Sequence, residues 1–210
     1  MIPHRTLRHA ACSVCCCLIL LAAGCMGRSE PARFYILQPV QDQADTPRDD
    51  CASWGTLNVL GVGPVVLPGY VDRDQMVTRR GDNTVTVAEF DRWAEPLDKA
   101  FSRTLAANLE PLVCARPVVS SPFPQGIQPD WQVTLQLFRH DCAPGRDCSL
   151  EASWAVLDAR GDAVTTGAAR LRQPLAGQSF EAMAATLSQL NAALAEEVAA
   201  SLRQAMRGRR

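Results

Sequence analysis

The cysteine thiols have the widest chemical range of the side chains in this sequence. The chain has nine of them. A thiol can carry a covalent lipid, pair in a disulfide or, as a thiolate, hold a metal ion. Four cysteines lie within the first 24 residues, the next is Cys25, and the last four are spread over the rest of the chain. Their positions therefore divide them into three groups with different predicted chemistry.

The segment 1–24 predicts a cleaved secretory signal peptide. Arg5 and Arg8 precede an uncharged apolar stretch over residues 10–23, which is shorter than the about 20 apolar residues that a spanning helix needs. Small residues stand directly before Cys25, and this arrangement resembles a lipobox, in which the cysteine sulfur receives a diacylglycerol. We therefore expect Cys25 to be the lipidated N-terminus of the mature chain, with palmitate among two or three acyl chains that anchor it stably.

An ordinary signal peptide with an incidental cysteine and an uncleaved anchor helix are the alternative interpretations of this segment. Met26, rather than an aspartate, follows Cys25, which favours transfer to the outer membrane, with the protein on its periplasmic face. Removing residues 1–24 reduces 21 basic residues to 19 and leaves 22 acidic ones, so the mature net charge is −3. This charge argues against a nucleic-acid partner.

The four remaining cysteines predict two disulfides, because an even number in an oxidising compartment usually pairs. Cys142 and Cys148 flank a short loop between two strand-like segments, which favours a bridge that closes a hairpin. Cys51 and Cys114 would then pair by elimination, although the sequence alone allows three connectivities. A zinc site is disfavoured, since no CxxC spacing occurs and His140 is the only histidine after the signal peptide.

Catalytic chemistry finds little support in the residue pattern. His140 stands beside Asp141 near the end of a predicted strand, where we expect an exposed histidine rather than a general base. No GxSxG sequence occurs, and the only lysine, Lys99, is not part of a phosphate-binding loop. We therefore expect neither an enzyme nor a cofactor, and a periplasmic hydrolase remains the least favoured alternative.

Hydrophobic spacing predicts a single α+β domain over residues 33–210, behind a lipidated tether at 25–32. Apolar residues at intervals of three and four predict two helices, at about 97–112 and about 180–206. Alternating or β-branched segments predict the strands. These segments are 34–37, 57–66 with a bulge or close approach at Gly61 and Gly63, 75–78, 84–87, 118–119, and a meander formed by 131–137, 150–156 and 164–171. This order favours a mixed, mostly antiparallel sheet with both helices packed on one face.

Several segments of the predicted domain together resemble a known family. They are Phe34–Leu37, Leu67–Arg73, Gln75–Arg79, Arg92–Leu97, Asn108 and Leu109. In order and spacing they resemble the PqiC family of ABC-type transport auxiliary lipoproteins, and the Arg-Trp-Ala-Glu-Pro-Leu run is the most specific part. The four mature cysteines do not belong to the family pattern.

The resemblance implies a non-enzymatic auxiliary subunit of an MCE/ABC-type system that moves lipids between two membranes and supports envelope integrity. Its implied partners are an MCE-domain transporter subunit, membrane lipid through the anchor, and further copies of itself in a ring-like homo-oligomer. A lipid carrier is the alternative, with an acyl chain between the sheet and the C-terminal helix in a cavity of roughly 300 Å³ or more.

Two groups of residues follow as candidates for this function. A turn that carries an aromatic ring and paired charges is a plausible contact site. Its residues are Pro68, Tyr70, Asp72 and Arg73. The family motif, in contrast, is expected to be mainly structural, with Trp93 packed in the core and Pro96 fixing the backbone at a helix start. Its residues are Arg92, Trp93, Glu95, Pro96, Leu97, Asn108 and Leu109.

Overall fold

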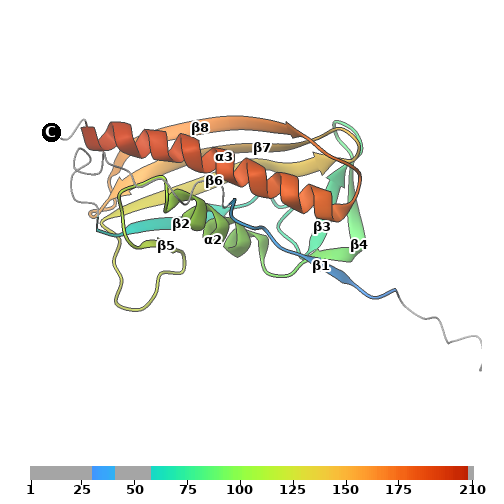
Figure 1. Ribbon diagram of the computed structural model, residues 1–210, viewed down its shortest axis with the longest axis horizontal. Coiled ribbons are helices and arrows are strands. Elements are labelled where there is room, and N and C mark those ends of the chain that lie inside the picture. The colour runs from blue at the N-terminus through green and yellow to red at the C-terminus, as the bar shows by residue number, and fades with distance from the viewer. Residues whose placement is uncertain (1–29, 41–57, 208–210) are drawn as a thin grey trace, which may run out of the picture. The chain divides into compact units, whose positions relative to one another are not determined.

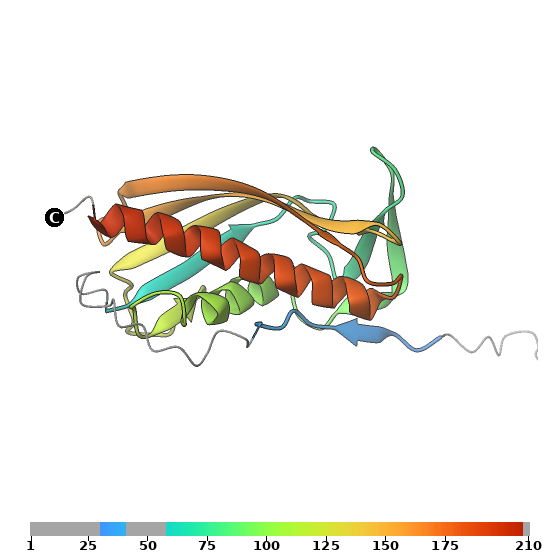
Figure 2. The ribbon, with the colours of Figure 1, turned by 45° about the horizontal axis from the view of Figure 1, so that its top comes forward.

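The computed structural model describes residues 30–40 and 58–207. Within them lie eight strands and two helices, which confirms the predicted α+β class. The strands are β1 Arg33–Tyr35, β2 Leu60–Val66, β3 Gln75–Arg79, β4 Val85–Trp93, β5 Val118–Ser120, β6 Trp131–Ala143, β7 Asp147–Asp158 and β8 Ala163–Pro174. The helices are α2 Leu97–Leu109 and α3 Phe180–Arg207. Both helices lie against the same face of the sheet (Figure 1; Figure 2).

The sheet is mixed, as predicted, but the prediction that it would be mostly antiparallel is wrong. Four of the seven strand pairings are parallel, namely β1–β4, β2–β5, β2–β6 and β3–β6. The predicted hairpin β3–β4 and the meander β6–β7–β8 are antiparallel. Turn signals reveal pairings between neighbouring strands in the sequence. The parallel pairings instead join strands that are separated by other elements, so no turn sequence between the two strands indicates that they pair.

The long helix α3 covers the meander. Its inward side chains recur at intervals of three and four residues, which places them on one face of the helix. The fully or almost fully buried ones include Leu187, Leu190, Leu194, Val198 and Leu202. The helix begins at Phe180, as predicted. Ser179 stabilises this start, because its hydroxyl accepts a hydrogen bond from the Ala182 N–H at 3.1 Å. This packed face forms the centre of the core.

The irregularity predicted at Gly61 and Gly63 is present in β2. The register between β2 and β6 shifts between Val62 and Val65. A Cβ atom at Gly61 would lie 2.7 Å from ring carbons of both Phe123 and Pro129. The glycine is therefore required by a close approach rather than by a turn.

A second close approach lies in the meander, where Trp154 faces Gly167 across β7 and β8. Trp154 is only 5% exposed, and a Cβ atom at Gly167 would collide with its indole ring. The glycine thus provides the space in which the indole packs on the helix-facing side of the sheet.

Gly167→Ala should therefore destabilise the protein by about 1–3 kcal/mol, because a well-packed tryptophan must move. Urea unfolding of the two proteins measures this difference. The matched control is Ala168→Ser at the exposed neighbouring position, which should change the unfolding free energy by less than about 0.5 kcal/mol. Equal stability of Gly167→Ala and the wild type would contradict the proposed packing.

Candidate functional site

The loop between β2 and β3 contains the four predicted contact residues. Strands β2 and β3 both pair with β6, one after the other along its length. The loop therefore runs beside the middle of β6, where the register against β7 shifts between Leu137 and Arg139. A turn closes it, since the Val71 N–H donates to the Pro68 carbonyl at 3.0 Å. Position and turn together give this loop a defined conformation.

The predicted contact residues divide into a supporting and an exposed part. Pro68 and Tyr70 are half-buried, and Val71, which directly follows Tyr70, is 3% exposed. Asp72 and Arg73 are exposed. The loop thus presents Asp72, Arg73 and the neighbouring Asp74 to solvent, above residues that are half-buried or buried.

A buried carboxylate, Asp141 of β6, holds the loop in place. It is 1% exposed, and the Tyr70 hydroxyl donates to its Oδ2 at 2.6 Å. The guanidinium of Arg79 donates to Oδ1 at 3.1 Å and to Oδ2 at 2.7 Å. Arg139 Nε donates to Oδ1 at 3.2 Å. We call these four side chains the Asp141 cluster; it joins the loop, the β3–β4 hairpin and the central strand.

The charges of the Asp141 cluster are strongly coupled. Burial alone would raise the pKa of Asp141, but hydrogen bonds from Arg79 and Tyr70 and the nearby charge of Arg139 outweigh it, so the pKa is lowered. Burial and the hydrogen bond to Asp141 raise the pKa of Tyr70 to about 12. Asp141 is therefore ionised and Tyr70 is neutral at neutral pH. The cluster is a structural support without a titrating base.

A second buried carboxylate, Asp91 of β4, fixes strand β1. Arg33 Nε and Nη2 donate to its two oxygens at 2.8 and 3.0 Å, and the Tyr35 hydroxyl donates to Oδ1 at 2.7 Å. The hydrogen bond from Arg33 is the main cause of the lowered pKa of Asp91. The Tyr35 ring also lies 6.1 Å from that of Phe180, at the start of α3. We call Arg33, Tyr35 and Asp91 the Asp91 clamp.

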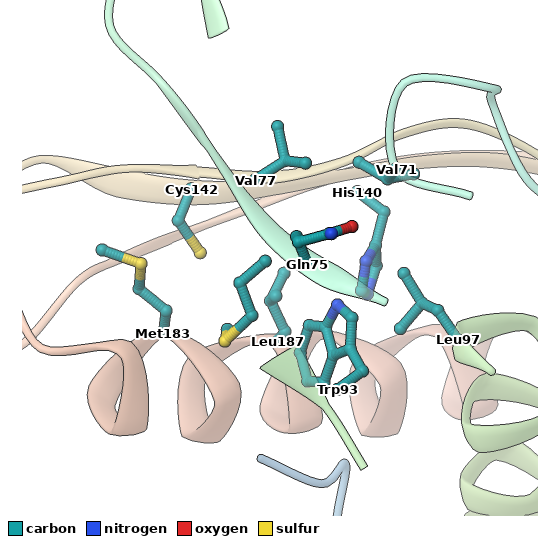
Figure 3. Close-up of a pocket in the computed structure, with 10 residues that line it drawn as sticks. Val71, Gln75, Val77, Trp93, Leu97, His140, Cys142, Met183 and Leu187 are labelled. Carbon is teal, nitrogen blue, oxygen red and sulfur yellow. The ribbon is translucent and has the colours of Figure 1, made fainter. Parts of the chain in front are cut away.

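His140 is buried, and the expectation of an exposed strand-end histidine is wrong. It is 2% exposed, and its ring meets that of Phe101 edge-on at a centroid distance of 5.5 Å. Before the bulge in β6, Leu135 and Leu137 face the helices; after it, His140 does so (Figure 3). The strand thus continues past the predicted end at residue 137 to Ala143, and the extra residue of the bulge turns His140 inward.

Neither ring nitrogen of His140 has a hydrogen-bond partner. Burial lowers its pKa to about 4, so the ring is neutral at neutral pH. A catalytic histidine would be paired with an acid and a hydroxyl group, and this arrangement is absent here within the described residues. The hydrolase alternative therefore gains no support.

A small cavity of about 10 Å³ lies between His140 and the helices, lined by Trp93, Leu97, Met183 and Leu187 among others (Figure 3). This volume holds about one water molecule, far less than an acyl chain requires. A larger depression of about 690 Å³ lies along β2, β6, β7 and β8, bordered by Thr134, Ser153 and Thr166, and is open to solvent. Within the described residues, the cavity between the sheet and α3 is therefore too small for the enclosed site that the lipid-carrier alternative requires.

The family motif lies partly in a strand and partly at a helix start. Arg92 and Trp93 end β4, which is longer than predicted, and Trp93 is 6% exposed. Pro96 directly precedes α2, and its carbonyl accepts the first helical hydrogen bond, from Ala100 at 3.0 Å. Leu97 is buried at 3% exposure. The Glu95 carboxylate pairs with Arg103 at 2.6 Å, so it acts through a specific partner besides the helix dipole.

Asn108 and Leu109 connect the two helices. The Asn108 amide donates to the Asn191 side chain of α3 at 2.9 Å, while its oxygen accepts from the Val40 N–H at 2.9 Å. Asn191 in turn donates to the Phe101 carbonyl at 3.2 Å. Leu109 is fully buried beside them. The sequence does not predict that Asn108 pairs with Asn191, because the apolar residues around an asparagine carry no information about its hydrogen-bond partner.

One predicted disulfide is present, between Cys142 and Cys148, which face each other across β6 and β7. Cys114 also takes part in a disulfide. Its predicted partner, Cys51, lies outside the described residues, as does the lipidation site Cys25, so both assignments stay predictions. Within 30–40 and 58–207, no group of three or more His, Cys, Asp or Glu side chains is arranged to hold a metal. In the same ranges, no helix is long and apolar enough to cross a bilayer.

Fold and site together define a domain whose surface loop is held by buried side chains, and the described part of the chain shows no catalytic arrangement. Residues 35–199 match the family model of the ABC-type transport auxiliary lipoprotein component. The match covers most of the chain, and the protein therefore belongs to this family of lipoproteins. A membrane lipid anchor is a property of the family. No curated protein matches the sequence.

Solved structures show the same fold at low sequence identity. A crystal structure of an uncharacterized protein has a TM-score of 0.64 at 19% identity, over 81% of this chain and 98% of that chain. Protein XCC0632 from Xanthomonas campestris, of family DUF330, has a TM-score of 0.63 at 14% identity, over 85% of this chain and all of that chain. A PelC dodecamer from Paraburkholderia phytofirmans is more distant, with a TM-score of 0.40 and 12% identity over 84% of this chain and 95% of that chain. The first two likenesses concern the fold alone, and the third is too distant to inform on assembly.

Proposed function

We propose that this lipoprotein is a PqiC-type subunit that docks an MCE-domain transporter subunit at the periplasmic face of the outer membrane. In this role it catalyses no reaction and transfers no lipid through its own core. Membership of the auxiliary lipoprotein family supports the role. The observation that carries the docking site is the pair Asp72 and Arg73, exposed on a loop that the Asp141 cluster holds in one conformation.

Rigidity of the loop favours binding because a preorganised surface loses less conformational entropy on association. A loop that exposes charged side chains of both signs also selects partners by charge complementarity. The Tyr70 hydroxyl, in contrast, donates its hydrogen bond to Asp141. It positions the loop rather than meeting the partner through that group.

Photo-crosslinking in intact cells tests the docking site. A photoreactive amino acid replaces Arg73, and a second variant carries it at Arg160, an exposed residue of the β7–β8 turn. The Arg73 variant should capture an MCE-domain protein, and the Arg160 variant should not. Capture of phospholipid alone at Arg73 would favour the carrier, and capture of another copy of this chain would place the homo-oligomer contact there. Either result would refute docking through this loop.

The anchor is tested separately with Cys25→Ala, which removes the sulfur that would carry the diacylglycerol. The variant should leave the membrane fraction, because several acyl chains supply the stable attachment. The measurement is fractionation of cells together with mass spectrometry of the mature N-terminus. A variant that remains membrane-bound and is processed as before would show that Cys25 is not the anchor.

A further inference from the structure

The outward face of β1 carries large apolar side chains in the first strand of the domain. Along β1 and the residues that follow, Arg33, Tyr35 and Leu37 point inward, to the Asp91 clamp and the core. Phe34 and Ile36 therefore point outward, since side chains alternate along an extended chain. They are 63% and 44% exposed. A phenylalanine exposed to this degree is costly in water and marks a contact surface when it lies in a patch.

The neighbouring strand extends this patch. Phe34 lies beside Arg92 in the parallel β1–β4 pairing. We call Phe34, Ile36 and Arg92 the β1 face. Because the Asp91 clamp fixes the opposite side of β1, these side chains cannot turn inward to escape solvent.

The length of the connection limits how far the β1 face can lie from the anchor. Eight residues lie between Cys25 and Phe34, so nine Cα–Cα steps connect them. Even a fully extended connection of this length reaches no more than about 30 Å. A protein whose Cys25 carries acyl chains in a bilayer therefore holds Phe34 within about 30 Å of the lipid surface, a distance from which β1 can reach the bilayer.

From this placement we infer that the β1 face is a membrane-contact site, with Phe34 and Ile36 inserted among the lipid headgroups and upper acyl chains. The inference rests on the lipid anchor of the proposed function. Aromatic and aliphatic side chains are suited to this interface. Arg92 can extend its charged group to the phosphates while its aliphatic part stays with the apolar residues. Contact at β1 would also orient the domain on the membrane, so that the docking loop has a fixed direction.

Tryptophan fluorescence in vesicles tests the site with the mature, lipidated protein. Phe34→Trp introduces the probe in the β1 face. Ala159→Trp is the matched control, at an exposed turn at the other end of the domain (Figure 1). Each protein is reconstituted into phosphatidylcholine vesicles with and without bromine on the acyl chains, and the emission of the wild-type tryptophans is subtracted. The added emission of Phe34→Trp should shift to the blue and be quenched by brominated lipid, whereas that of Ala159→Trp should show neither change.

Each other outcome contradicts the inference. If both proteins float with the vesicles and Phe34→Trp is not quenched, the β1 face does not meet lipid, and a protein occupant must be sought. Equal quenching at both positions would show contact without preference for β1. Failure of the wild-type protein to float with vesicles would refute the anchor itself. This last result separates a failure of the proposed function from a failure of the membrane-contact site.

Discussion

Asp141→Asn should lower the free energy of unfolding by about 3 kcal/mol at pH 7, because it leaves two guanidinium groups without their shared carboxylate. The carboxylate is almost fully buried, while Arg79 and Arg139 retain side-chain exposures of 19% and 24%. Partial access of water to the two arginines keeps the loss at the lower end of the range for broken buried ion pairs. The measurement is urea unfolding followed by circular dichroism.

Tyr70→Phe provides the matched comparison for this prediction. It removes one hydrogen bond to Asp141 and leaves both ion pairs, so the expected loss is about 1–1.5 kcal/mol. Both variants should also reduce crosslinking from Arg73, since the loop loses its support. An Asp141→Asn protein as stable as the wild type, with unchanged crosslinking, would show that the cluster does not hold the loop.

The pH dependence of Asp141→Asn follows from the lowered pKa of Asp141. Above the pKa of an unfolded aspartate, the ionised carboxylate stabilises the folded protein. As the pH falls through the lower folded-state pKa, that contribution is lost. The stability difference between the wild type and Asp141→Asn should therefore shrink in acid.

The free energy of unfolding should fall by about 3 kcal/mol as the pH is lowered from 6.5 to 4, because burial lowers the pKa of His140 in the folded protein to about 4. Above pH 6.5 the ring is neutral in both states and contributes no pH dependence. Below it, the unfolded chain binds a proton first, and stability falls until the folded ring is also protonated near pH 4. Unfolding free energies measured at intervals of half a pH unit trace this change.

His140→Leu isolates the histidine from the acidic groups that titrate nearby. The variant keeps a side chain of similar size and removes two buried nitrogens that have no partner. Such a change should be neutral or stabilising at pH 7. The difference in stability between variant and wild type should grow as the pH falls to about 4. A constant difference across this range would mean that His140 has partners or solvent access that the structure does not show.

Local patterns sufficed for several elements of this protein. The alternation in residues 131–171 predicted the meander, and the apolar spacing predicted the position and length of α3. The spacing of Cys142 and Cys148 predicted their bridge. In each case the interacting residues lie within one strand, one helix or one hairpin. Periodicity and turn residues are then enough.

The tertiary structure alone decided the parallel pairings and the supports of the site. Asp91 and Asp141 read as ordinary acids in the sequence, and their arginine and tyrosine partners lie 56 to 71 residues away, apart from Arg139. One bulge in β6 reversed the direction of His140. The sequence by itself determined the elements, the family resemblance and the expected anchor at Cys25. Which charges are buried together depends on contacts between distant segments, and these form only when strands with little local signal meet in the folded core.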